Sequence, residues 1–176
     1  MNLFSFEGKS PVVHPGAFVA PTATLIGDVT VEDGASIWYG VVIRADICTV
    51  VVREGTNVQD NSVLHAAPGE TLTIGPHATI GHSCVVHCRE VGEKALIGNG
   101  STLLDGAVVG PGTLVAAGSV VIPGAEIPGG VVAAGIPCKA TKPIEGTSSE
   151  IWVETNSIYY RELGARHGAG ITRLEQ

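Results

Sequence analysis

The stretch VGEKALIGNGSTLLDGAVVGPGTLVAAGSVVIPGAEI, residues 91–127, places an aliphatic residue at every sixth position. The same interval occurs upstream, where two insertions and one contraction shift its phase. The anchors of this register are Val13, Val19, Leu25, Val31, Ile37, Ile43, Val52, Val58, Leu64, Ile74, Ile80, Val86, Val91, Ile97, Leu103, Val109, Val115, Val121 and Ile127. A six-residue period is typical of a parallel β-helix, a solenoid of short strands joined by corners.

Two further patterns support this fold. A small or β-branched residue follows most anchors by four positions, so two side chains per hexad point into a narrow prism. Pairs such as Asp105-Gly106 supply the turn conformations that corners require. A β-sandwich is the alternative, but its turns are spaced unevenly at about 8–12 residues. We therefore predict an all-β solenoid, a parallel β-helix, over residues 1–142, with an N-terminal strand segment at 1–12.

After Ile127 the repeat gives way to a proline- and glycine-rich exit, and residues 143–176 are expected to form a linker and one α-helix. The helix is predicted at 148–167, because Thr147 and Glu150 have the spacing of a capping box and Gly168 suits a C-terminus. Its apolar stripe is expected to pack on the solenoid of this chain or of a neighbour. The stripe contains Ile151, Trp152, Thr155, Ile158, Tyr159 and Leu163.

Composition limits the possible partners. The chain has 176 residues, which suits one domain, and a net charge of −7 without a Lys or Arg cluster argues against nucleic acid. No basic start precedes an apolar run, and no stretch approaches the roughly 20 apolar residues of a membrane span. We expect no membrane contact, a cytoplasmic location and four reduced cysteines, since their spacing fits no disulfide scaffold.

The register also predicts which polar residues stack. If three hexads form one coil, residues three hexads apart lie about 4.8 Å apart in adjacent coils. One column, directly after its anchors, contains Arg44, His65 and His87. A second column, on another edge, contains Asp60 and His82, with Gln59 beside it.

Three of these residues suggest a metal site. His65 and His87 can share a metal, because imidazole nitrogens bind zinc at about 2.0–2.1 Å. His82 is five residues from His87 around a corner, a contour of roughly 16 Å, so it must come from a neighbouring chain. A closed ring of prisms predicts a homotrimer with a metal at each interface. Zinc with three histidines and an open fourth position supplies hydroxide at neutral pH, which favours hydration or hydrolysis chemistry.

Packing or surface positions are the alternative for any histidine. The remaining three lie outside both columns, and we expect them to be exposed to solvent. They are His14, His77 and His167.

The runs RAD (44–46), NVQDNSVLH (57–65) and IGHSCVVHC (80–88) resemble the signature of the gamma-class carbonic anhydrase family of left-handed β-helix proteins. The resemblance covers about residues 10–142. It implies a left-handed coil and the reversible hydration of CO2 to bicarbonate. It also implies Zn²⁺, with Fe²⁺ or Co²⁺ as other possibilities, bound by His65 and His87 of one subunit and His82 of the next.

The resemblance implies further roles. In the family, the glutamine matching Gln59 orients the hydroxide nucleophile or bicarbonate, and the asparagine matching Asn57 positions that glutamine. Charged residues of the family form contacts at the subunit interface near the metal, where the guanidinium of an arginine can pair with carboxylates. The matching charged positions are Arg44, Asp46 and Asp60. Tyr160 resembles a tyrosine that reaches toward the site, although core packing is an equal alternative.

Two positions depart from the best-known active members of the family. Those carry a glutamate after the aspartate matching Asp46 and an acidic loop between the first two histidines, which together shuttle protons. Here Ile47 follows, and the loop HAAPGETLT (65–73) offers only Glu70. A missing shuttle predicts slow turnover at an intact metal site.

Other functions remain open. The same site could hydrolyse acyl-CoA thioesters, as relatives within the family do. A catalytically quiet trimer could keep the metal as a clasp between subunits. Hexapeptide acyltransferases share the AGIPCKA exit at 134–140, but they typically use one catalytic histidine without a three-histidine metal site.

Overall fold

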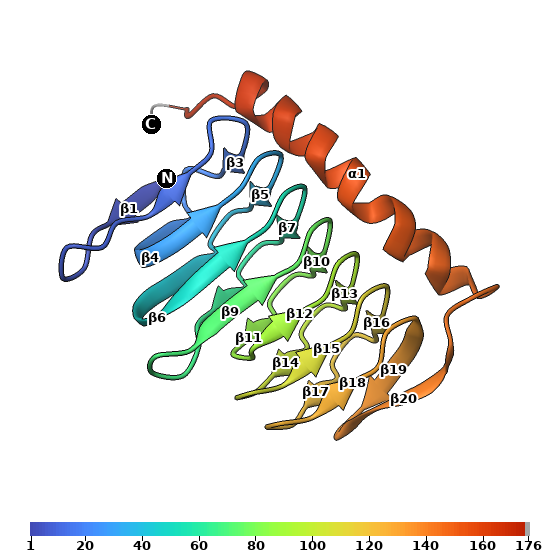
Figure 1. The fold of residues 1–176 in the computed structure, drawn as a ribbon. Coiled ribbons are helices and arrows are strands. Elements are labelled where there is room, and N and C mark those ends of the chain that lie inside the picture. The colour runs from blue at the N-terminus through green and yellow to red at the C-terminus, as the bar shows by residue number, and fades with distance from the viewer. Residues whose placement is uncertain (175–176) are drawn as a thin grey trace.

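The computed structural model describes residues 1–174, which form a parallel β-solenoid of about seven turns and a C-terminal helix beside it (Figure 1). The helix α1 spans Ser148–Gly170. The strands are β1 (Asn2–Phe4), β2 (Val12–Val13), β3 (Phe18–Val19), β4 (Thr24–Val31), β5 (Ser36–Ile37), β6 (Val42–Val52), β7 (Asn57–Val58), β8 (Val63–Leu64), β9 (Thr71–Ile74), β10 (Thr79–Ile80), β11 (Val85–Val86), β12 (Glu90–Val91), β13 (Leu96–Ile97), β14 (Thr102–Leu103), β15 (Val108–Val109), β16 (Leu114–Val115), β17 (Val120–Val121), β18 (Glu126–Ile127), β19 (Val131–Gly135) and β20 (Cys138–Pro143).

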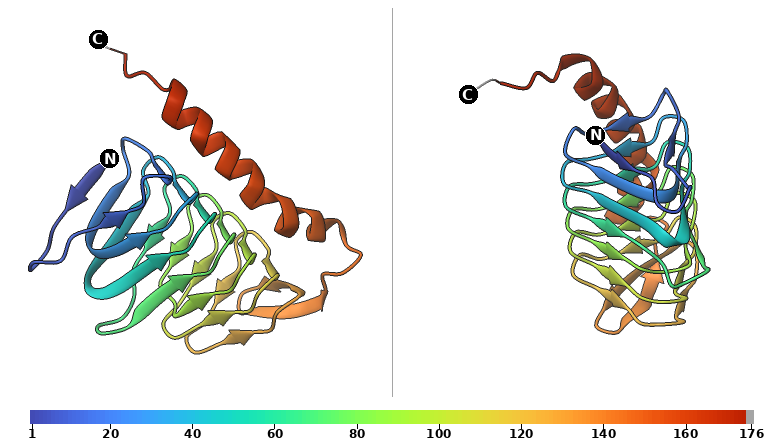
Figure 2. Two further views of the ribbon diagram at one scale, coloured as in Figure 1. Left: turned by 45° about the horizontal axis from the view of Figure 1, so that its top comes forward. Right: turned by 90° about the vertical axis from the view of Figure 1, so that its left-hand side faces the viewer.

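Three walls enclose the solenoid, and the coils stack along its axis (Figure 2). Wall A contains β2, β9, β12, β15 and β18. Wall B contains β3, β5, β7, β10, β13, β16 and β19, with β20 paired antiparallel to β19 at its end. Wall C contains β1, β8, β11, β14 and β17. The long strands β4 and β6 run through walls C and A and bend at the corner between them.

The strand pairing confirms the predicted register. Ile43 pairs with Leu64, and Leu64 pairs with Val86 in the next coil. The anchors from Leu25 to Val121 are at most 1 % exposed, so they form one continuous aliphatic core. Each coil therefore depends on its neighbours to bury its apolar side chains.

Glycine is needed where β4 turns from wall C to wall A. Gly27 has a φ of +77°, which L-residues with side chains rarely adopt. A Cβ there would also collide with the carbonyl oxygen of Ala45 on the adjacent strand. The close approach of β4 and β6 at this corner thus requires glycine.

Helix α1 begins where the capping box predicts. Thr147 is the N-cap, and its hydroxyl accepts a hydrogen bond from the Ser149 N–H at 3.3 Å. The Glu150 carboxylate accepts from the Gly146 N–H at 2.9 Å, one residue before the predicted partner. The helix continues three residues past its predicted end, because the N–H of Ile171 still bonds to the carbonyl of His167. Within residues 1–174, the structure contains no helix long and apolar enough to cross a membrane.

The predicted packing face of α1 is wrong for this chain. The helix runs back along wall B from the last coils to the first, and buries Val153, Ser157 and Gly164. A Cβ on Gly164 would lie 3.2 Å from the Cβ atoms of Phe18 and Ser36, so small residues allow the close approach. The aromatic and aliphatic stripe instead lies 57–62 % exposed, at Ile151, Trp152, Ile158 and Tyr159.

Two of the three histidines expected at the surface are partly buried. His167 lies beside wall B, with Nδ1 3.0 Å from the Tyr39 hydroxyl and its ring edge-on to Trp38 at 4.9 Å between centroids. His77 occupies a tight corner with a φ of 56°. Both expectations were wrong because the register says nothing about contacts from the helix or within corners. His14 is exposed, as predicted.

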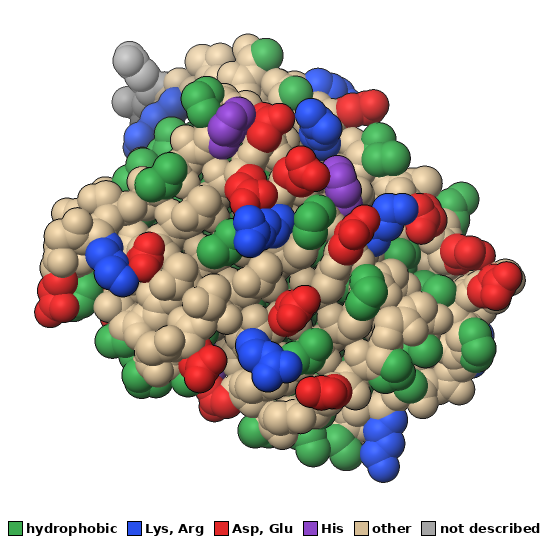
Figure 3. Space-filling model, viewed as in Figure 1, with side chains coloured by type: hydrophobic (Ala, Val, Ile, Leu, Met, Phe, Trp, Pro, Cys, Tyr) green, Lys and Arg blue, Asp and Glu red, His purple; other side chains and the backbone are tan. Residues whose placement is uncertain are grey.

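Surface charge is mixed on the face drawn in Figure 3, where acidic and basic side chains lie among one another. This face shows no basic cluster of the kind that binds nucleic acid. The four cysteines, Cys48, Cys84, Cys88 and Cys138, are buried and form no disulfide in the structure.

Replacing a core anchor should destabilise the solenoid strongly. Ile74 is fully buried on wall A, and Ile74→Ala should lower the free energy of unfolding by about 2–5 kcal/mol through lost burial and a cavity. Ile122 is 45 % exposed, and Ile122→Ala is the matched control with a far smaller loss. Urea unfolding at equal protein concentration measures both, and equal losses would contradict the assignment of the core.

Candidate functional site

The first edge of the site lies at the corner between walls C and A. His65 follows β8 and His87 follows β11, and these strands pair in register, so the two imidazoles lie one coil apart. Their ring centroids are 5.2 Å apart. Arg44, on β6, lies one coil before His65 and two before His87, as the predicted column requires. We call this the two-histidine edge.

The Nδ1 atoms of both imidazoles already have partners. Nδ1 of His65 lies 2.7 Å from the carbonyl oxygen of Arg44, and Nδ1 of His87 lies 2.7 Å from Oδ1 of Asp105. Because a carbonyl oxygen only accepts, Nδ1 of His65 donates a proton and leaves the Nε2 lone pair free in the neutral ring. The carboxylate beside Nδ1 of His87 favours the same tautomer. Histidines that bind metals usually have such a partner for the second nitrogen.

Asp105 was not predicted as a site residue. It follows β14, the strand that pairs with β11 one coil beyond His87. The register could have revealed this neighbour, because Asp105 lies only two residues after the anchor Leu103. The turn motif Asp105-Gly106 instead suggested a purely structural role.

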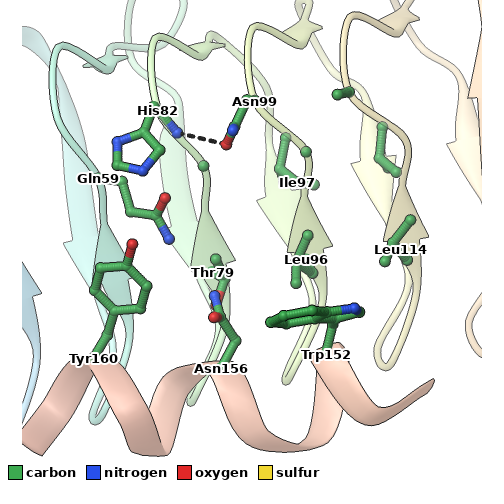
Figure 4. Close-up of a pocket in the computed structure, with 14 residues that line it drawn as sticks. Gln59, Thr79, His82, Leu96, Ile97, Asn99, Leu114, Trp152, Asn156 and Tyr160 are labelled. Carbon is green, nitrogen blue, oxygen red and sulfur yellow. Dashed lines mark hydrogen bonds between the residues drawn. The ribbon is translucent and has the colours of Figure 1, made fainter. Parts of the chain in front are cut away.

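The second edge lies at the corner between walls B and C. Here Nδ1 of His82 lies 3.0 Å from Oδ2 of Asp60, which comes from the preceding coil, so Nε2 of His82 is free as well. The backbone N–H of His82 donates to Oδ1 of Asn99 at 3.0 Å (Figure 4). We call this the one-histidine edge. The structure thus places Asp60 beside His82, as the columns predict.

Gln59 belongs to the one-histidine edge. Its side chain is 4 % exposed, and its Nε2 donates to Oδ1 of the fully buried Asn57 at 3.0 Å. The contact expected between these two residues is therefore present. Since an amide offers one oxygen and one NH₂ group, this bond leaves Oε1 of Gln59 available to a ligand.

A groove of about 420 Å³ begins at this edge and continues between wall B and α1 (Figure 4). Gln59, His82 and Tyr160 lie at one end, and the Tyr160 hydroxyl points toward the other two. Leu96 and Trp152 line the apolar part farther along.

Tyr160 both reaches toward the site and packs against the core, the two alternatives that the sequence left open. It lines the groove, and its ring packs edge-on against Trp38 with 5.4 Å between centroids. Burial raises the pKa of the Tyr160 phenol, and the negative charge of Asp60 raises it further. The hydroxyl therefore stays protonated at neutral pH and can donate a hydrogen bond.

Arg44 and Asp46 form an ion pair beside the two-histidine edge. Nη1 of Arg44 lies 2.8 and 2.7 Å from the two carboxylate oxygens of Asp46, and the hydrogen bond from Arg44 lowers the pKa of that carboxyl. Oδ1 of Asp46 is 3.9 Å from Nε2 of His65. Ile47 is 49 % exposed and lines a hollow together with Glu70.

The two edges do not meet in one chain. Among residues 1–174, the structure contains no group of three or more His, Cys, Asp or Glu side chains that could hold a metal. The donor set nevertheless fits a metal such as zinc, because all three histidines have an occupied Nδ1 and a free Nε2. Burial also lowers the pKa of His65, which favours the neutral ring that binds metals.

The hexapeptide coils place this chain among the parallel β-solenoid proteins. Comparison with known proteins identifies its family. The chain is 43 % identical to gamma carbonic anhydrase 1, mitochondrial, of Arabidopsis thaliana, over 96 % of this chain and 62 % of that protein. It is 36 % identical to the carnitine operon protein CaiE of Escherichia coli, over 94 % of this chain and 84 % of CaiE. The chain belongs to the gamma carbonic anhydrase-like family of hexapeptide-repeat proteins, which includes CaiE.

The chain spans about three fifths of the length of the Arabidopsis carbonic anhydrases that it matches. No family model matches it. Among solved structures, a hexapeptide transferase family protein of Anaplasma phagocytophilum aligns with a TM-score of 0.87 and 39 % identity over 93 % of this chain and 96 % of that one. A Bacillus cereus protein described as a candidate acetyltransferase gives 0.91 and 34 % identity over 95 % and 96 %.

Removing Arg44 should raise the pKa of Asp46. The depressed pKa means that the Asp46 carboxylate contributes stability above its ordinary pKa of about 3.9 and loses that contribution as pH falls through the folded-state value. In Arg44→Met, carboxyl NMR titration should show the Asp46 midpoint moved upward. Arg53→Met removes a comparable guanidinium, which pairs with Glu32, and should leave Asp46 unchanged. An unchanged midpoint in Arg44→Met would refute the pairing.

Proposed function

We propose that this protein is a metal-dependent carbonic anhydrase that reversibly hydrates CO2 to bicarbonate at the interfaces of a homotrimer. One observation carries the proposal: three histidines with occupied Nδ1 and free Nε2 atoms lie on two edges that a single chain does not bring together. The two-histidine edge of one subunit and the one-histidine edge of the next would complete a three-nitrogen set.

In this arrangement His65 and His87 of one subunit and His82 of its neighbour would hold Zn²⁺, with Fe²⁺ or Co²⁺ as alternatives. Such a metal, when bound, supplies hydroxide at neutral pH. The partners of the three Nδ1 atoms fix the tautomer and orientation of each ring before any metal arrives.

Gln59 would act from the subunit that donates His82. Gln59 lines the groove, and its Oε1 can accept a hydrogen bond from the nucleophile while Asn57 holds the amide in place. The Tyr160 hydroxyl can donate to a carbonate oxygen from the same side. We propose that Arg44, Asp46 and Asp60 make charged contacts across the interface, because all three lie beside the two edges.

Proton removal is expected to limit the rate. Near the two-histidine edge, Ile47 stands where active relatives carry a glutamate, and Glu70 is the only acid in the loop 65–73. Asp46 is held by Arg44, so it is a weak proton acceptor.

Complementation between variants tests the split site. His82→Ala and His65→Ala should each bind no metal tightly, since every interface loses a ligand. Trimers refolded from a mixture contain an interface that joins an intact two-histidine edge to an intact His82. A ring of mixed composition has one such interface, so metal analysis should find about one ion per mixed trimer. Full metal content in His82→Ala alone would contradict the proposal.

Activity tests the role of Gln59. In stopped-flow CO2 hydration, Gln59→Leu should lower kcat/KM by roughly 10–100-fold while metal content stays unchanged, because the ligands remain and the orienting oxygen is lost. Ile122→Ala, at an exposed site outside the groove, is the control. If the wild type loaded with zinc, cobalt or, without oxygen, iron hydrates CO2 no faster than buffer does, the proposal is refuted.

Thioester hydrolysis is the second candidate, and the groove favours it. A volume of about 420 Å³ lies in the range of clefts that bind drug-sized ligands and exceeds what CO2 needs. The apolar lining from Leu96, Leu114 and Trp152 suits an acyl group. A thiol-release assay over CoA esters separates the two reactions.

A catalytically quiet trimer clasped by metal is the third possibility. Chelation would then dissociate the trimer, and no substrate would turn over.

The cytoplasmic location also stays a prediction, because the Arabidopsis relatives are named as mitochondrial proteins.

A further inference from the structure

We propose that Asn156 on α1 is a positioning residue for Gln59 and acts through Thr79 and Asn57. Only the catalytic consequence of this inference rests on the proposed function. The side-chain relay itself is a property of the folded chain.

Four side chains form the relay. Nε2 of Gln59 donates to Oδ1 of Asn57 at 3.0 Å, and Nδ2 of Asn57 donates to Oγ1 of Thr79 at 2.8 Å. Nδ2 of Asn156 donates to the same Oγ1 at 3.2 Å. The first two bonds lie within wall B, whereas the last one reaches it from the helix, 77 residues later in the chain.

Burial makes the relay sensitive to each of its members. Asn57 is fully buried, Thr79 is 3 % exposed and Gln59 is 4 % exposed, so water has little access to replace a lost partner. A hydroxyl oxygen has two lone pairs, and the two amide donors occupy both of them at Thr79. Loss of Asn156 frees one lone pair and lets the hydroxyl rotate, which loosens its hold on Asn57 and, through it, on Gln59.

The strand register explains why Thr79 holds this position. Thr79 of β10 pairs directly with Asn57 of β7, so their side chains project from the same face of wall B. Figure 4 shows Asn156 reaching from α1 toward Thr79, in the groove that Gln59 also lines. Asn156 thereby acts on the site through Thr79 and Asn57 and supplies no group to the reacting atoms.

Helix docking does not depend on Asn156. The helix is held by the buried Val153 and Gly164, by an ion pair between Lys94 and Glu154 at 2.7 Å, and by His167 beside Tyr39. A variant at Asn156 can therefore keep the fold and lose only the relay.

The test combines NMR with kinetics on the full-length protein. In Asn156→Leu and in Thr79→Val, the side-chain NH₂ signals of Gln59 and Asn57 in the metal-free protein should shift and exchange faster with solvent. Thr79→Ser restores the hydroxyl and should restore the wild-type signals. Thr155→Val, at an exposed neighbour on the same helix, is the control.

In CO2 hydration, Asn156→Leu should lower kcat by about tenfold, with KM and metal content unchanged. Unchanged Gln59 signals in both Asn156→Leu and Thr79→Val would overturn the relay. Should the wild type show no hydration while the NMR changes occur, the proposed function fails and the relay stands. Should Asn156→Leu not fold, the comparison of Thr79→Val with Thr79→Ser decides the proposal.

Discussion

The stacking of one coil on the next, at the spacing of hydrogen-bonded parallel strands, is the constraint on which this structure depends. A hexad cannot bury its anchor alone, so each apolar side chain is shielded only by the coils above and below it. The same stacking fixes the columns of outward-pointing side chains. His65 and His87 share an edge because Leu64 and Val86 share a wall, and the position of either histidine follows from the core.

This constraint also divides the site. Within a prism, His82 lies at another corner and cannot turn to meet His65 and His87, because its own anchor, Ile80, holds it on wall B. Three histidines that are each prepared for a metal, on edges that one chain keeps apart, are explained most simply by a neighbouring chain. Asp60 and Asp105, the carboxylates beside Nδ1 of His82 and His87, come from adjacent coils, so the stacking orients these two imidazoles as well as placing them.

The sequence alone predicted the parts of the structure that follow from its six-residue period or from helix capping. The anchors, the two histidine columns and the N-terminus of α1 follow from spacing and capping chemistry, and the structure confirms them. The helix face was wrong for packing on this chain's own solenoid, because apolar residues at helical spacing do not reveal which side can approach a flat wall. Gly164 and Ser157 are buried against the wall, and a Cβ on Gly164 would already lie 3.2 Å from side chains of that wall. Asp105 and the relay through Thr79 were missed because side-chain partners between coils require distances, which a register alone does not supply.

Anomalous scattering from crystals of protein purified without oxygen tests the central claim most directly. The account predicts a homotrimer with one metal peak at each interface, bound by His65 and His87 of one subunit and by the neighbour's His82. A monomeric protein, or a trimer whose interfaces hold no metal between these histidines, would contradict it.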